Sequence, residues 1–201
     1  MLTSRTTIIA VLGIIVAAST VYYYTTNINL AHNDSTMAAS SPEQASIDHL
    51  RIYLSHTWLP KPTIKITVQN AHPSTTLTFL SWDTPIDPSA LNTGVLQLVD
   101  AVSEENIEGP GLKLNRLLPP PRDALVEISP QDVVEVDVEL SAPWIPGNGK
   151  LVKVHAHGEW KAVWAKTKDA VSDEELNAMG GADVLQGPFR SIRDVELEVT
   201  K

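Results

Sequence analysis

The sequence predicts an all-β fold, an antiparallel β-sandwich of about seven to eight strands with one short helix, preceded by an N-terminal hydrophobic helix. Two observations favour this fold. Apolar and polar residues alternate with a period of two in several short stretches, and connections that contain Pro and Gly separate them. In addition, 43% of the 201 residues are hydrophobic, which is enough for one well-buried core.

The strand candidates run through the whole second part of the chain. They are residues 50–54, 64–68, 76–82, 95–99, 124–128, 134–140, 151–166 and 195–199. In the longest stretch, 151–166, Trp160 and Trp164 have the same parity as Val152 and Val154. Residues of one parity lie on one face of a strand, so we expect both Trp side chains to be buried.

One short helix is expected between the last two strand candidates. Ser172 and Glu175 have the spacing of a capping box, and Gly180–Gly181 follows as a stop signal. With these elements, the chain divides into a targeting segment at 1–25, a polar linker at 26–48 and a β-sandwich domain at 49–201.

The N-terminal segment is a targeting signal. Residues 6–24 carry no charge, and Arg5 precedes them. The segment is either a signal anchor that spans the membrane or a signal peptide cleaved near Ala17–Ser19. Both alternatives send the domain into the secretory pathway, as an extracellular protein or a single-pass type II membrane protein with the domain on the non-cytosolic side. Asn33, in Asn-Asp-Ser, is a candidate for N-glycosylation.

Composition excludes several classes of function. There are 15 basic and 24 acidic residues, which argues against nucleic acid as a partner, since nucleic-acid-binding domains cluster Lys and Arg. The chain has no cysteine, so it forms no disulfide, thiol catalyst or thiolate metal site. It also lacks a Gly-rich phosphate loop, His-Glu-x-x-His and Gly-x-Ser-x-Gly. We therefore predict no catalytic residue, no cofactor and no enzyme activity.

One constellation of residues is a candidate metal site. His155, His157 and Glu159 stand at i, i+2 and i+4, so they share a strand face and have the residue types of a zinc site. Lys153 and Lys161 flank them on that face, and cations so close oppose binding of another cation. The favoured interpretation is therefore a solvated strand face, with no metal.

Other chemistry-bearing residues have structural interpretations. Asp83, Asp87 and Asp100 lack the spacing of a calcium loop, so we expect them to stabilise turns. Pro119–Pro121 is either a polyproline recognition surface or a stiff connection between strands, and the connection is favoured.

Three segments carry a resemblance to a known family. They are Ile66–Pro73 with Leu77–Pro85, then Gly111–Asp123, and Leu125–Pro130 with Val133–Val134. Together they resemble small secreted fungal proteins that are similar to the propeptide region of deuterolysin-type metalloproteases. The resemblance spans about residues 50–199 and lacks the catalytic domain. It implies an immunoglobulin-like sandwich and, by analogy, assistance to the folding of a protease or its inhibition.

The sequence favours a non-catalytic extracytoplasmic interaction domain. It would be a monomer that binds a protein partner through strand edges and connecting loops, and the resemblance implies that this partner is a protease. Residues 6–24 would bind the membrane if they are not cleaved. Two alternatives are a metal-dependent enzyme that uses His155, His157 and Glu159, and a wall- or glycan-binding domain.

Overall fold

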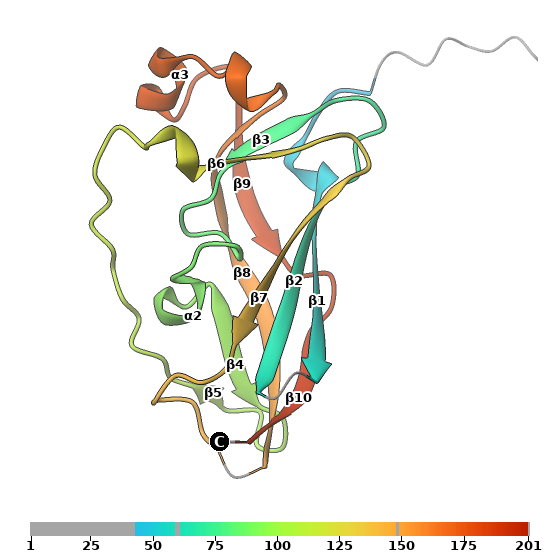
Figure 1. Ribbon diagram of the computed structural model, residues 1–201, viewed down its shortest axis with the longest axis vertical. Helices are drawn as coiled ribbons and strands as arrows, with labels where there is room; N and C mark the ends of the chain where they lie inside the picture. Colours follow the sequence, from blue (N-terminus) through green and yellow to red (C-terminus); the bar gives the residue numbers. More distant parts are fainter. Residues whose placement is uncertain (1–42, 59–60, 148, 201) are drawn as a thin grey trace, which may run out of the picture. The chain divides into compact units, whose positions relative to one another are not determined.

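Ten strands form two antiparallel sheets in the computed structural model, which describes residues 43–58, 61–147 and 149–200 (Figure 1). The strands are β1 Leu50–Trp58, β2 Pro62–Asn70, β3 Leu77–Leu80, β4 Leu96–Asp100, β5 Asn106–Ile107, β6 Leu125–Ile128, β7 Val133–Glu139, β8 Lys150–Trp164, β9 Val184–Arg190 and β10 Val195–Val199. The helices are short. They are α2 Ala90–Thr93 and α3 Asp173–Ala178, with 3-10 turns η1 Ile47–His49, η2 Arg122–Ala124 and η3 Lys168–Ala170.

The two sheets differ in size. The smaller has the order β1-β2-β7, and its registers pair Leu50 with Asn70 and Thr63 with Glu139. The larger has the order β5-β4-β8-β3-β6, and β9 and β10 also pair with β8. A parallel bridge between Ile52 and Ser191 joins β1 to the corner between β9 and β10. The predicted antiparallel β-sandwich class is thereby confirmed.

The 15-residue strand β8 organises the larger sheet. Its first half pairs with β4 and β10, and its second half pairs with β9 and β3. Val152, Val154 and Ala156 are fully buried, while His157 and Glu159 are exposed, as the alternation predicts. The period of two breaks at a register shift between Trp160 and Val163, after which successive residues are buried.

Aromatic rings fill the centre of the core. Trp160 is 1% exposed and Trp164 0%, so the predicted burial of both is confirmed. The Trp160 ring lies 4.9 Å from the ring of Phe79 and 4.9 Å from that of Phe189. A Cβ atom at Gly158 would stand 2.6 Å from the Phe189 ring, so only glycine leaves room for this packing.

The sequence prediction omitted three elements. Strand β9 contains Gly187 and Pro188, which interrupt its alternation, and β5 has only two residues. The four-residue helix α2 was also not predicted. The predicted α3 is confirmed: Ser172 Oγ accepts a hydrogen bond from Glu175 N, and Glu175 Oε2 accepts one from Ser172 N. Its C-cap is Met179 with φ of 45°, so the helix ends one residue before the glycines.

The predicted targeting segment, most of the linker and Asn33 lie outside the described residues. No helix within the described part of the chain has the length and hydrophobicity needed to cross a membrane.

Candidate functional site

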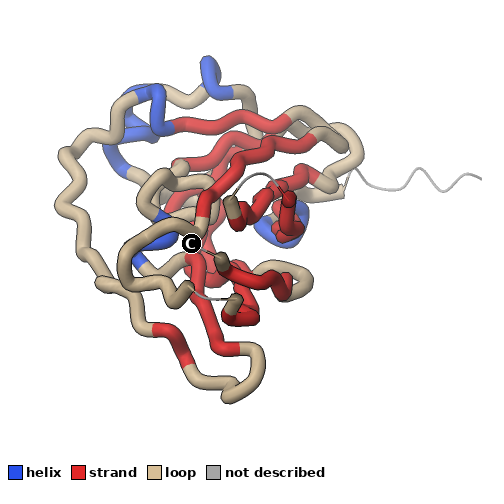
Figure 2. The backbone as a smooth tube through the Cα atoms, turned by 60° about the horizontal axis from the view of Figure 1, so that its bottom comes forward, coloured by secondary structure: helices blue, strands red, loops and turns tan. Residues whose placement is uncertain are grey.

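A long irregular connection, residues 108–121, links β5 to η2 and is called the leucine strap here. It is the long yellow-green loop between β5 and β6 in Figure 1 and the long tan loop at the left edge of Figure 2. Four of its leucines are exposed: Leu112 to 48%, Leu114 to 39%, Leu117 to 84% and Leu118 to 66%. Leucine side chains in water cost free energy, and their grouping on one segment is typical of an interaction surface.

Hydrogen bonds fix the first half of the leucine strap to the domain. Leu112 N donates to the carbonyl oxygen of Asn92 in α2 at 2.9 Å. Further along, Arg116 Nη2 donates to Asp87 Oδ2 at 2.5 Å, and the Arg116 guanidinium lies 5.5 Å from the centre of the Trp82 ring. The leucines are therefore presented on a backbone anchored at two points.

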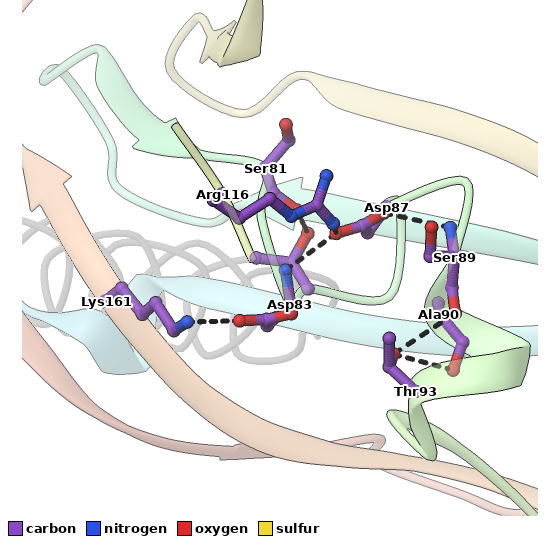
Figure 3. A network of polar contacts seen from close by, with 9 residues as sticks. Ser81, Asp83, Asp87, Ser89, Ala90, Thr93, Arg116 and Lys161 are labelled. Atoms are coloured by element: carbon purple, nitrogen blue, oxygen red, sulfur yellow. Dashed lines mark hydrogen bonds and ion pairs between the residues drawn. The ribbon is translucent and has the colours of Figure 1, made fainter. Parts of the chain in front are cut away.

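Asp87 is the buried end of this anchor. Its side chain is 1% exposed and accepts hydrogen bonds from Asp83 N at 2.8 Å and Ser89 N at 2.9 Å, in addition to Arg116 (Figure 3). A buried carboxylate is stable only when it is paired and hydrogen-bonded. The turn before α2 satisfies two of its acceptor sites locally, and Arg116 supplies the charge from a distant segment.

A second ion pair extends the network to the larger sheet. The ammonium of Lys161 on β8 contacts the Asp83 carboxylate, as Figure 3 shows. Asp83 itself has φ of 57°, a left-handed conformation that Asp tolerates better than most residues. The turn at 81–89 is thus connected to the leucine strap on one side and to β8 on the other. The structural roles expected for Asp83 and Asp87 are confirmed by these bonds.

The far end of the leucine strap is held by η2. Pro120 is buried, while Pro119 and Pro121 are exposed. Arg122 Nη2 then donates to Val171 O at 2.7 Å and contacts Asp173 Oδ1 at 3.0 Å. Burial of the central proline agrees with the favoured interpretation of Pro119–Pro121 as a stiff connection.

A small pocket lies beside the first residues of the leucine strap. Its volume is about 100 Å³. Gly109 and Gly111 line it from the strap, Leu96 and Leu98 from β4, and Trp144 from the connection between β7 and β8. The surface therefore offers exposed leucines beside a hollow whose wall combines apolar side chains with polar ones, among them Gln97, Asn106 and Glu108.

The metal candidates lie on the outer face of β8. His155 Nε2 is 2.8 Å from Gln97 Oε1 on β4, and the rings of His155 and His157 are 5.6 Å apart. Burial is the largest effect on His155 and lowers the pKa of its imidazole. Within residues 43–58, 61–147 and 149–200, no three His, Asp or Glu side chains form a group that could hold a metal ion. The geometry gives no further support to a metal site formed by His155, His157 and Glu159.

Four Trp side chains are described, and each has packing or polar contacts within the domain. Trp160 and Trp164 are buried, and Arg116 lies over the ring of Trp82. Trp144 is half-buried, and its Nε1 is 3.3 Å from Asn92 Oδ1. The aromatic faces are used for packing or for the anchor of the leucine strap.

Sequence reasoning did not single out the leucine strap as a site. Its signal is four leucines in seven residues, 112–118, between Gly109-Pro110-Gly111 and Pro119–Pro121, without the alternation of a strand. The segments around Trp82 and Arg116 both appear in the family resemblance, but their contact joins positions that no local pattern connects.

Comparison with known proteins identifies the family to which the domain belongs. A family model for the immunoglobulin-like domain matches residues 49–199, so the chain belongs to that family. This confirms the immunoglobulin-like sandwich that the resemblance implied. The chain is also 33% identical over 131 residues to a protein of Arthroderma benhamiae named "Uncharacterized secreted protein". The match covers 64% of this chain and 65% of that protein, so the chain spans less than two thirds of its relative.

Proposed function

We propose that this chain is a non-catalytic, extracytoplasmic interaction domain that binds a protein partner through the leucine strap. The observation that carries this proposal is the exposure of Leu117 and Leu118 on a segment that Arg116 fixes in place. An anchored apolar surface binds with less loss of conformational freedom than a mobile one. The immunoglobulin-like family and the described residues offer no competing catalytic constellation.

Photo-crosslinking tests the proposal directly. A photoreactive amino acid is placed at position 117 and, as a matched control, at Val102, which is 85% exposed and lies outside the strap. We expect a discrete crosslinked protein from position 117 only, in cells that express the chain. Its yield should fall when Leu118→Ser is added. Equal crosslinking from both positions would contradict a role for the leucine strap.

The extracytoplasmic location rests on the uncharged residues 6–24 behind Arg5 and on the printed name of the relative. This location is tested by adding protease to intact microsomes and measuring whether the domain is protected. The domain should resist added protease until detergent opens the vesicles. Digestion without detergent would place it in the cytosol and reject this part of the proposal.

A narrower form of the proposal follows the resemblance to deuterolysin-type propeptides. In this form the partner is a secreted protease, which the domain helps to fold or inhibits. The family match and the relative do not bear on this role, which rests on the resemblance alone. It requires that the protein crosslinked at position 117 be a protease whose activity falls with the wild-type chain and is unaffected by a Leu117→Ser, Leu118→Ser variant.

A further inference from the structure

Within the described residues, strand β7 has one edge that is hydrogen-bonded to β2 and one free edge. Asp132 O accepts from Asn70 N at 3.0 Å, and Leu140 N donates to Pro62 O at 2.8 Å. Because backbone groups of successive strand residues point to opposite sides, the even-numbered residues of β7 face β2. The N–H and C=O groups of Val133, Glu135, Asp137 and Glu139 therefore point to the free edge. All four of these residues are exposed.

Other outer strands of the described sheets are bridged at one point, interrupted by proline or short. On β1, Ile52 O accepts from Ile192 N at 2.9 Å, and on β6, Leu125 O accepts from Lys168 Nζ at 2.9 Å. Strand β9 contains Pro188, which has no N–H. Strands β5 and β10 have two and five residues. The seven-residue β7 thus combines length with an unbridged edge.

The two faces of β7 have different chemistry at this edge. On the inner face, Val134, Val136 and Val138 pack against the core but remain half-buried. An added strand with apolar side chains at alternate positions would cover them. Removal of this apolar surface from water favours binding of the added strand.

The outer face of β7 is acidic. Glu135 pairs with Lys65 at 3.0 Å, and Glu139 pairs with Lys61 at 2.8 Å. Hydrogen bonds from these lysines lower the pKa of both glutamates, which keeps them charged. Asp137 has no ion pair within the described part of the chain. Lys65, the register partner of Asp137 on β2, forms its ion pair with Glu135, so the two carboxylates share this one cation.

We propose that the free edge of β7 binds an extended segment of a partner protein as a fourth strand, and that this segment alternates basic with apolar side chains. A basic residue opposite Asp137 supplies a second cation to a face on which Glu135 and Asp137 share Lys65, and apolar residues lie over Val136 and Val138. This surface is separate from the leucine strap, and the inference does not rest on the function proposed above.

Charge also disfavours two other occupants. In a pair of copies joined through β7, residues 135, 137 and 139 of both chains would face one another, and like charges directly opposite destabilise a sheet. The chain's own residues 1–42 contain one Lys or Arg, Arg5, and so lack the alternating basic pattern. The carboxylates of Glu135, Asp137 and Glu139 thereby favour binding of a basic strand from another protein and disfavour self-association.

The test uses the full chain and a synthetic peptide of seven residues, the length of β7, in which lysine alternates with valine. Residue-resolved amide exchange is the readout. We expect saturable binding that slows exchange at Glu135, Asp137 and Glu139 and leaves Val134 and Val136, already bonded to β2, unchanged. Binding without this alternate protection would overturn the proposal. Protection of these amides before peptide is added would assign the edge to the chain itself or to a second copy.

Two matched peptides separate strand addition from charge attraction. Lysines opposite the odd-numbered residues of β7 use their N–H groups in the new ladder, whereas the valine N–H groups point away. Methylation of the backbone nitrogens of the lysines should therefore abolish binding. Methylation of the backbone nitrogens of the valines should preserve it. Equal binding of the two peptides, which have the same charge, would overturn the proposal.

Protein variants test the basic preference. Asp137→Lys should weaken binding of the lysine peptide by about tenfold, since it replaces an attractive cross-strand pair by a repulsive one. Glu196→Lys on β10 makes the same change in net charge and serves as the control, with affinity within about twofold of wild type. An equal loss of peptide affinity in the two variants would show that only the net charge of the protein matters. It would contradict the assignment of the binding site to β7.

Discussion

Asp87 and Asp100 occupy two turns with the same local chemistry and different consequences. Each carboxylate accepts hydrogen bonds from two backbone N–H groups, Asp83 and Ser89 for Asp87, and Val102 and Ser103 for Asp100. The two carboxylates form ion pairs with different cations. Arg116 comes from the leucine strap, while Lys150 comes from the start of β8.

Burial separates the two turns further. The Asp87 side chain is 1% exposed and its Arg116 partner 27%, whereas Asp100 is 11% exposed and Lys150 49%. Water therefore screens the pair of Lys150 and Asp100 more strongly than the pair of Arg116 and Asp87. The same side-chain motif therefore closes a turn at Asp100 and, at Asp87, also anchors a segment that carries the candidate site.

The largest expected effect is at Asp87. Asp87→Ala leaves two N–H groups and the Arg116 guanidinium without an acceptor, so the free energy of unfolding should fall by about 3–5 kcal/mol. Urea unfolding measures the loss. Asp100→Ala is the matched control and should lose clearly less. Equal losses would show that burial does not distinguish the two turns.

Arg116 tests whether the anchor positions the leucine strap. Arg116→Ala should cost about 2 kcal/mol, because it removes a charged hydrogen bond and the contact with Trp82. Limited proteolysis should then cut residues 108–121 faster, while the amides of β8 stay protected. Arg116→Lys retains the charge and should give an intermediate rate. A strap as resistant as in wild type would mean that other contacts hold it.

The stabilisation of the fold by Asp100 depends on pH. The hydrogen bond from Lys150, followed by those from Val102 and Ser103, lowers the pKa of its carboxyl from 3.8 to about 2. A group whose pKa is lower in the folded state stabilises the fold above its ordinary pKa, and this contribution disappears as pH falls towards 2. Wild type should therefore lose more stability between pH 4 and pH 2 than Asp100→Asn. Parallel stability curves would contradict this role.

The smallest effects are expected at the exposed leucines. Leu117→Ser and Leu118→Ser should each change the free energy of unfolding by no more than about 0.5 kcal/mol, because both side chains already lie in water. Leu98→Ala, at a leucine 1% exposed, is the contrasting variant and should cost about 2–5 kcal/mol by urea unfolding. A large loss at Leu117 would identify the strap as a packing element.

Alternation predicts the parts of this fold in which one strand face is buried. It places β2, β7 and β8 correctly and predicts that Trp160 lies in the core. It fails for β9, since Gly187 and Pro188 disrupt the pattern while pairing with β8 fixes the strand. Long-range pairing can impose a strand on a segment whose local sequence does not indicate one.

The candidate site is less predictable from sequence. The turn chemistry of Asp87 follows from its neighbours in Asp87-Pro88-Ser89. Its contact with Arg116 does not, because 29 residues separate the two and no periodicity joins them. The open edge of β7 is likewise a property of the sheet order, which residues 133–139 do not determine by themselves.

The central place of β8 has a consequence for biosynthesis. Strands β3 and β4 both pair with it, yet they precede it by a long stretch of chain. At about 5–20 residues per second, the roughly 60 residues from the end of β4 to the end of β8 take about 3 to 12 s to synthesise. During that interval the nascent chain exposes unpaired apolar strands, which is the state that chaperones bind. We expect productive folding to begin only after β8 has emerged, so the yield of this domain depends on chaperone capacity during synthesis.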